Sequence, residues 1–161
     1  MIVVSNTSPI INLAMVGRLD LLHQLYDKII IPQAVYNEIV VLGSGQPGSK
    51  EIQNEKWFEV RAIKNTNLAN ALKIELDEGE AEAIALAVEL KAGLLLLDEK
   101  LGRKAASRFG IDFIGLLGMI VDAKQRDIIP EGKTIIDNLI QQAGFWIQER
   151  LYHEILQTLG E

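Results

Sequence analysis

Two kinds of hydrophobic pattern alternate along the chain: short continuous runs, and longer stretches in which apolar residues recur every three or four positions. Short runs of β-branched, aromatic or leucine residues between polar segments are typical of strands. They predict strands at residues 2–5, 28–31, 57–60, 94–97 and 111–114. The consecutive leucines at 94–97 indicate a strand that is buried on both faces.

The stretches with helical spacing predict helices between the strands. They lie at residues 10–22 with an interruption near Gly17, after Pro32, and at 68–76, 80–91, 99–108, 115–126 and 131–143, and a terminal amphipathic helix follows Gly144. Pro32 suits the first turn of its helix, residues 43–49 form a flexible loop, and residues 77–79 break the helical pattern.

Strands that alternate with helices are typical of a parallel sheet covered by helices on both faces. The chain is therefore expected to be a three-layer α/β/α domain with a central parallel sheet of four to five strands. Its 161 residues, 48% apolar and 24% charged, fit one ordinary globular domain. Within this domain, 1–161, we expect residues 127–161 to form a C-terminal helical extension packed on the rest.

Composition narrows the possible chemistry. The chain has no cysteine, which excludes disulfides, zinc–thiolate sites and thiol nucleophiles, and its two histidines are too few for a multi-histidine site. A metal would therefore be a hard cation held by oxygen, such as Mg²⁺ or Mn²⁺.

The net charge is −6, so nucleic acid contact would need a local basic patch or a bound metal. The longest uncharged run, residues 1–17, is broken by polar residues and falls short of the ~20 residues of a membrane helix. No secretory signal is visible, and we expect a cytoplasmic protein without a membrane partner.

Acidic and amide side chains stand where parallel strands end. Asn6 and Asp98 each follow a predicted strand directly. Glu80 lies at the start of a predicted helix of about 12 residues, which rises ~1.5 Å per residue. The strand that follows runs back over about five residues at ~3.3 Å each, a similar distance, so that Asp98 returns to the level of Glu80. Glu38 lies in the second turn after Pro32, and its side chain leans toward the helix start. These four side chains are expected to meet at one edge of the sheet.

Three carboxylates at close quarters repel one another, and their pKa values rise unless a cation lies between them. A divalent ion removes that repulsion, and it can polarise a phosphodiester and activate water for its hydrolysis. The predicted site therefore suits metal-dependent phosphodiester cleavage.

The order of these segments resembles the PIN-domain ribonuclease family. Its four motifs are similar to residues 3–13 (Val-Val-Ser-Asn-Thr-Ser-Pro-Ile-Ile-Asn-Leu), 30–38, 79–87 and 94–98. The similarity spans about residues 1–115, and residues 103–123 resemble a bacterial and archaeal subfamily of poorly known function. The order of the motifs and the 18-residue step from Glu80 to Asp98 carry the resemblance.

The resemblance implies metal-dependent RNA cleavage, often by the toxin of a toxin–antitoxin pair, with RNA and an antitoxin protein as partners. It implies Glu38, Glu80 and Asp98 as catalytic residues, and the same three with Asn6 as ligands of Mg²⁺ or Mn²⁺. The family usually has aspartate where this chain has Asn6. An amide oxygen can coordinate a cation but adds no negative charge, so metal affinity should fall.

Basic residues follow Asp98 on one helical face. Lys100, Arg103 and Lys104, with Arg108 beyond them, are candidate RNA contacts, although a solvated helix surface would show the same pattern.

Other interpretations of the same residues stay open. Asn6 could act only as a helix cap, and the whole chain could be a catalytically impaired PIN-fold module that binds RNA or a protein. An aspartyl-phosphate phosphotransfer domain is disfavoured, because its lysine and hydroxyl partners are not found. The apolar stripe between Trp146 and Leu159 favours packing on the domain itself, with a homodimer or partner surface as the alternative.

Overall fold

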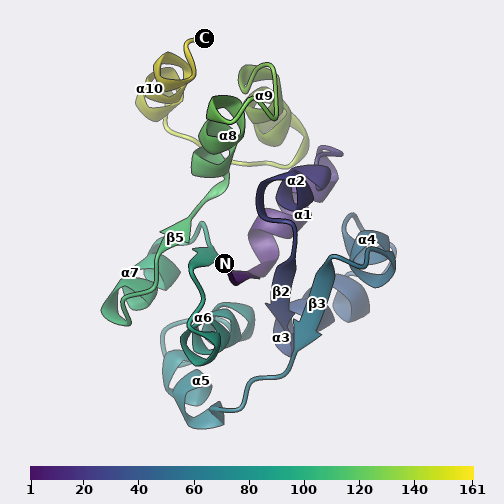
Figure 1. Ribbon diagram of the computed structural model, residues 1–161, viewed down its shortest axis with the longest axis vertical. Coiled ribbons are helices and arrows are strands. Elements are labelled where there is room, and N and C mark those ends of the chain that lie inside the picture. The colour runs from purple at the N-terminus through teal and green to yellow at the C-terminus, as the bar shows by residue number, and fades with distance from the viewer.

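A single parallel sheet forms the centre of the computed structural model, which describes all residues 1–161 (Figure 1). Its five strands lie in the order β3-β2-β1-β4-β5, and every neighbouring pair is parallel. The strands are β1 (Val3–Ser5), β2 (Ile29–Pro32), β3 (Phe58–Arg61), β4 (Leu94–Leu96) and β5 (Phe113–Ile114). The predicted α/β class, with helices around one parallel sheet, is confirmed.

Strand β1 occupies the middle of the sheet and pairs on one side with β2 and on the other with β4. The chain therefore builds outward from β1 in one direction and then returns to extend the sheet in the other. Ligand sites in such sheets lie beyond the carboxyl ends of the strands at this reversal. Here that position is the edge beyond Ser5 of β1 and Leu96 of β4.

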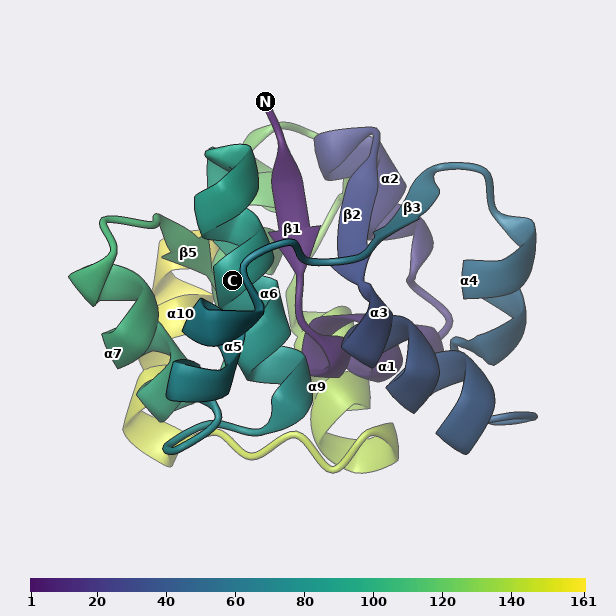
Figure 2. The same cartoon turned by 90° about the horizontal axis from the view of Figure 1, so that it is seen from below.

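Helices cover both faces of the sheet (Figures 1 and 2). One core joins the strand residues Val3 and Leu96 to side chains of α1 (Thr7–Met15), α2 (Asp20–Tyr26), α8 (Leu116–Gln125) and α9 (Lys133–Gln142). The opposite core joins Val4, Leu95 and Leu97 to α6 (Glu78–Leu90) and α7 (Lys100–Arg108), with α5 (Thr66–Leu72) beside them. Since successive strand residues enter opposite cores, Leu95, Leu96 and Leu97 are all fully buried, as the unbroken leucine run predicts.

The segment after β2 differs in detail from the expectation. Pro32 ends β2 and is the N-cap of α3 (Gln33–Tyr36), with an extended backbone (φ −74°, ψ 164°), rather than a first-turn residue. Helix α3 continues directly into a π-helix, η1 (Asn37–Leu42). The loop after it leads into α4 (Ser49–Asn54), which the sequence did not predict because Ile52 is its one apolar residue.

Helix α6 begins two residues before the predicted start. Asp77 is its N-cap and accepts a hydrogen bond from the Glu80 N–H at 2.8 Å, so Glu78 and Gly79 belong to the first turn. The acidic string that suggested a break is a capping sequence.

Helices α9 and α10 lie on the same side of the sheet as α8. Helix α10 (Glu149–Leu159) packs against α8, and Leu159 is buried. The Tyr152 hydroxyl donates to Asp137 of α9 at 2.6 Å, which ties α10 to α9. No helix in the structure is both long and apolar enough to span a membrane.

Candidate functional site

Asn6 lies at the sheet edge where the strand order reverses. Its backbone N–H continues the β1–β4 ladder by donating to the Leu96 carbonyl at 3.1 Å, and only 3% of the residue is exposed. The side-chain nitrogen donates to Glu99 Oε2 at 3.2 Å, whereas Oδ1 is buried and has no hydrogen-bond partner. A buried acceptor without a partner costs about 1–3 kcal/mol, so Oδ1 is poised to accept a donor or a cation.

The interpretation of Asn6 as a mere cap is not supported by its side chain. Asn6 does occupy the N-cap position of α1, but its side chain makes no capping hydrogen bond. The amide is held against Glu99 instead.

Glu38 reaches this edge from the π-helix η1. Its Oε2 accepts a hydrogen bond from Thr7 Oγ1 at 2.6 Å, which joins η1 to the start of α1. Burial raises the pKa of the Glu38 carboxyl, the charges of Asp77 and Glu78 raise it further, and hydrogen bonds from Thr7 and the Gly79 backbone act against them. A π-turn at this position is notable because such turns occur frequently at functional sites.

Gly79 is what allows Glu38 to approach α6. A Cβ atom on Gly79 would lie 2.5 Å from Glu38 Oε1, closer than real Cβ contacts allow. The missing side chain thus creates the space that the Glu38 carboxylate occupies.

Glu80 lies in the first turn of α6 and is 8% exposed. Burial raises its pKa from 4.5 to about 7, and the neighbouring charges of Asp77, Glu99 and Glu38 contribute to the shift. These four residues, Glu38, Asp77, Glu80 and Glu99, are called the acidic cluster below. None of its members takes part in an ion pair with Lys, Arg or His, so the repulsion within it is not neutralised by the protein.

Glu99 is the member that sequence reasoning missed. Its Oε2 accepts from Asn6 Nδ2 at 3.2 Å and its Oε1 accepts a short hydrogen bond from Ser8 Oγ. Glu99 is the N-cap of α7, and the sequence suggested only that it starts a helix. The sequence did place Glu99 next to Asp98 after the strand, but it did not show which of these two adjacent acids belongs to the site.

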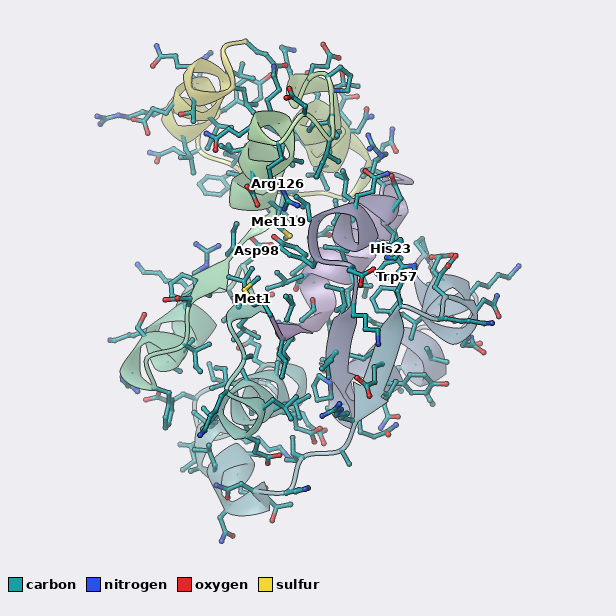
Figure 3. The ribbon with its side chains drawn as sticks, in the orientation of Figure 1. Met1, His23, Trp57, Asp98, Met119 and Arg126 are labelled. Atoms are coloured by element: carbon teal, nitrogen blue, oxygen red, sulfur yellow. The ribbon has the colours of Figure 1, made fainter.

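The Asp98 side chain points away from the acidic cluster, toward the start of α8. Its Oδ1 accepts from the Leu116 N–H at 3.1 Å and lies 3.5 Å from Arg103 Nη2. Burial raises the pKa of the Asp98 carboxyl, while the Leu116 and Arg103 contacts lower it. The structure thus brings Asn6, Glu38 and Glu80 together with Glu99, and places Asp98 at the border of this group, near the middle of the molecule (Figure 3).

The basic residues of α7 are used unequally. Arg103 Nε donates to the Leu97 carbonyl at 2.9 Å, and Arg108 lies 3.7 Å from Glu75. Lys100 and Lys104 are exposed and have no ion-pair partner. The two lysines therefore remain available for phosphate groups, whereas Arg103 has a structural task.

The chemistry at this edge fits a hard divalent cation, since the carboxylates of the acidic cluster offer oxygen ligands and Asn6 Oδ1 is unpaired. However, no three acidic or histidine side chains are arranged so that they could hold a metal ion as they stand. Glu38 and Glu99 instead accept hydrogen bonds from Thr7, Ser8 and Asn6. Ion binding would require these two carboxylates to rotate inward.

Comparison with known protein families finds a match over almost the whole chain. The family DUF3368, described as a PIN domain, matches residues 2–161. No curated protein matches the chain.

Proposed function

The chain belongs to the PIN-domain family, and from this premise we propose that it is a divalent-metal-dependent endoribonuclease that hydrolyses RNA phosphodiester bonds. Membership of the family indicates a nuclease-type hydrolase. The divalent ion, Mg²⁺ or Mn²⁺, the RNA substrate and the biological role are the parts that we add.

The observation that carries the proposal is the unpaired, buried Asn6 Oδ1 beside carboxylates with raised pKa values. An orphaned acceptor and unneutralised acids are each unfavourable alone, and a single divalent cation relieves both. Asn6, Glu38, Glu80 and Glu99 would hold the ion, with Asp98 at its border. When bound, the ion supplies charge stabilisation for a phosphodiester under hydrolysis.

The residues of the chain have separate tasks in this scheme. Thr7 and Ser8 hold Glu38 and Glu99 through their hydroxyl groups in the metal-free protein. Lys100 and Lys104 on α7 would attract the RNA phosphates, which compensates locally for a net charge of −6.

We also propose that the protein is the toxin of a toxin–antitoxin pair and acts in the cytoplasm on cellular RNA. Induced expression in a bacterium should then arrest growth, and expression of Glu80→Gln should not. Equal growth arrest by both proteins would argue against a toxin that acts through this site.

The direct test is cleavage of a labelled RNA with Mn²⁺ and with chelator. We expect cleavage only with Mn²⁺, and a loss of at least about 10²-fold in Glu80→Gln, because a lost ligand charge weakens the ion. Glu59→Gln on the exposed surface of β3 is the matched control and should cleave normally. Cleavage that persists in Glu80→Gln would place the activity elsewhere.

A second candidate is a catalytically impaired PIN module that binds RNA or a protein. Two observations favour it: the amide at position 6, and the absence of three acids arranged to hold an ion. The two candidates differ in one measurable property. If the protein is the nuclease, Mn²⁺ must bind to its folded state, and this binding raises the melting temperature by mass action. The binding module has no such requirement.

A further inference from the structure

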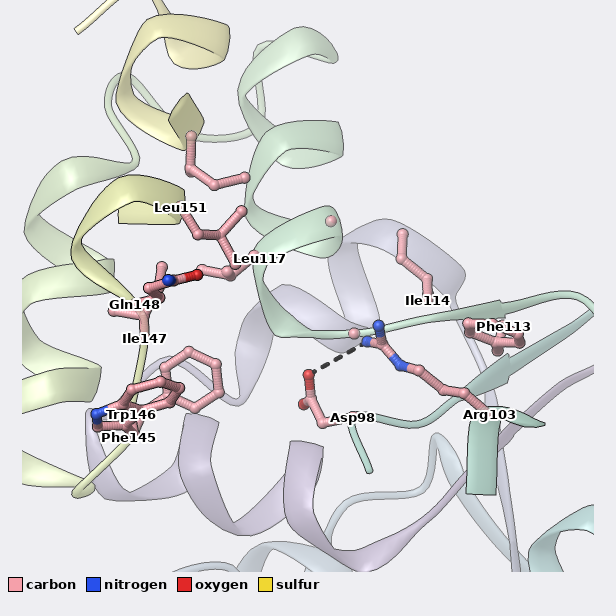
Figure 4. A pocket seen from close by; sticks show the side chains of 13 residues that line it. Asp98, Arg103, Phe113, Ile114, Leu117, Phe145, Trp146, Ile147, Gln148 and Leu151 are labelled. Atoms are coloured by element: carbon pink, nitrogen blue, oxygen red, sulfur yellow. Dashed lines mark ion pairs between the residues drawn. The ribbon is translucent and has the colours of Figure 1, made fainter. Parts of the chain in front are cut away.

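A cleft of ≈ 610 Å³ opens on the side of the acidic cluster toward which Asp98 points (Figure 4). Asp98 lines this cleft, and Glu99, the next residue, belongs to the acidic cluster. The cleft therefore begins where the candidate site ends. Its volume lies within the usual range of ligand-binding pockets, about 300–1,000 Å³.

The walls of the cleft are aromatic and apolar. Phe113, Phe145 and Trp146 line it, which is half of the four phenylalanines and two tryptophans in the chain. Trp146 lies in the segment between α9 and α10 and is 82% exposed. The other tryptophan, Trp57, is stacked on His23 away from the cleft (Figure 3). An indole left facing solvent beside a cleft is suited to stacking with a planar ligand.

The polar end of the cleft is an ion pair in a fixed orientation. The Arg103 guanidinium lies 5.3 Å from the Phe113 ring centroid, donates to the Leu97 carbonyl at 2.9 Å and lies 3.5 Å from Asp98. Its plane is held by these contacts before any ligand arrives. The pair presents donors and an acceptor side by side, which complements the polar edge of a planar heterocycle.

We propose that this cleft binds one unpaired base of the RNA strand, which stacks on Trp146 while its polar edge meets Asp98 and Arg103. The inference rests on the proposed action on RNA and extends it to a base-binding subsite next to the cleavage site. Unpaired RNA bases are recognised by such stacking combined with hydrogen bonds to their edges. A base in a duplex cannot reach the cleft, so the substrate must be single-stranded at this position.

A protein helix is the competing occupant of an apolar groove. It would cover the aromatic walls, but it would also remove the Asp98–Arg103 pair from water without offering a planar polar edge. Burying an ion pair with incomplete hydrogen bonding is unfavourable. The ion pair at the end of the cleft therefore favours a base over an apolar helix.

The test is the affinity for a fluorescein-labelled single-stranded RNA hexamer, measured by anisotropy in chelator so that no cleavage occurs. Trp146→Ala should weaken binding about tenfold, the effect of losing one base–aromatic stack, and Trp146→Phe should retain most of the affinity. Leu42→Ala is the matched control, because Leu42 is also 82% exposed but lies at the end of η1. Equal affinity of Trp146→Ala and the parent protein would overturn the proposal.

A series of hexamers, each lacking one base, separates base binding from other roles of Trp146. One abasic position should weaken binding to the parent about tenfold and should remove the difference between the parent and Trp146→Ala. A difference that persists with every abasic hexamer would overturn the proposal, as would a change in sedimentation of Trp146→Ala with no change in RNA affinity. Because these measurements use no metal, they are independent of the Mn²⁺ cleavage assay: base binding in chelator together with no cleavage in Mn²⁺ would reject the nuclease and keep the subsite.

Discussion

At the scale of single residues, Asn6 combines a nitrogen that donates to Glu99 with a buried oxygen that has no partner. The sequence identified this position through its place after the first strand. It could not show that the amide turns from the helix cap toward Glu99. That orientation depends on β4 lying beside β1, and these strands are about 90 residues apart in the chain.

Asn6→Asp should tighten Mn²⁺ binding and raise RNA cleavage, because a further negative charge attracts a divalent ion in a partly desolvated cleft. The same change should lower the melting temperature of the metal-free protein, since another acid joins the acidic cluster. Calorimetric titration with Mn²⁺ beside a cleavage assay measures both effects. Unchanged Mn²⁺ affinity would show that Asn6 is no ligand, and tighter Mn²⁺ without cleavage would favour the binding module.

Glu80 should give the metal-free protein an unusual pH dependence. Its pKa is raised from 4.5 to about 7 in the fold, so the folded state binds more protons than the unfolded state between these values. The contribution of protonated Glu80 to stability is present below pH ~4.5 and is lost as the pH rises through about 7. Melting temperatures in chelator should therefore fall from pH 5 to pH 8.

Glu80→Gln should remove much of that decline, because the amide does not ionise, whereas Glu59→Gln should leave it unchanged. Saturating Mn²⁺ should also flatten it by favouring the ionised carboxylate. A decline of equal slope in Glu80→Gln would mean that other groups cause it.

At the scale of elements, the sequence predicted the strands better than the type and the starts of the helices that carry Glu38 and Glu80. The leucine run was recognised as a strand buried on both faces, because a pattern without polar residues reports burial directly. The π-helix η1 and the start of α6 at Glu78 were not recognised. The start of α6 did carry a local signal, since Asp77 caps the Glu80 N–H, but the π-helix that brings Glu38 against Gly79 is not contained in local periodicity.

Gly79→Ala tests that contact. In an exposed helix this change stabilises by up to about 1 kcal/mol, but here the new Cβ would lie 2.5 Å from Glu38 Oε1. The end of a flexible side chain can move, so we expect an unchanged or slightly higher melting temperature together with weaker Mn²⁺ binding and slower cleavage. Adding Gly79→Ala to Glu38→Gln should cause little further loss of Mn²⁺ affinity. Additive losses would show that Gly79 acts independently of Glu38.

At the scale of the whole molecule, one side chain joins the last turn of the chain to two earlier helices. Glu161 accepts hydrogen bonds from the Gly132 N–H at 2.8 Å, the Lys133 N–H at 3.1 Å and Lys124 Nζ at 3.0 Å. These contacts lower the pKa of the Glu161 carboxyl. The carboxylate thereby caps α9 and holds α10 against α8, which carries part of the cleft wall.

Glu161→Gln should lower the free energy of unfolding by about 1 kcal/mol at pH 7, the usual value of a lost helix cap. The folded pKa is depressed, so this contribution is present above the ordinary value of 4.5 and is lost as the pH falls below it. Urea unfolding at pH 7 and pH 3 measures the difference, which should be smaller at pH 3. A difference of equal size at both values would mean that the charge of Glu161 is irrelevant.

The central position of β1 also bears on the order of events during synthesis. Its neighbour β4 is translated about 90 residues later, and Glu99 follows only after β4. Because contacts between distant segments form late, a nascent chain that already displays Asn6 and Glu38 still lacks Glu80 and Glu99, half of the ligands proposed for the ion. If the chain is the ribonuclease proposed above, it would therefore be unable to cleave the messenger RNA that encodes it until most of the polypeptide has left the ribosome.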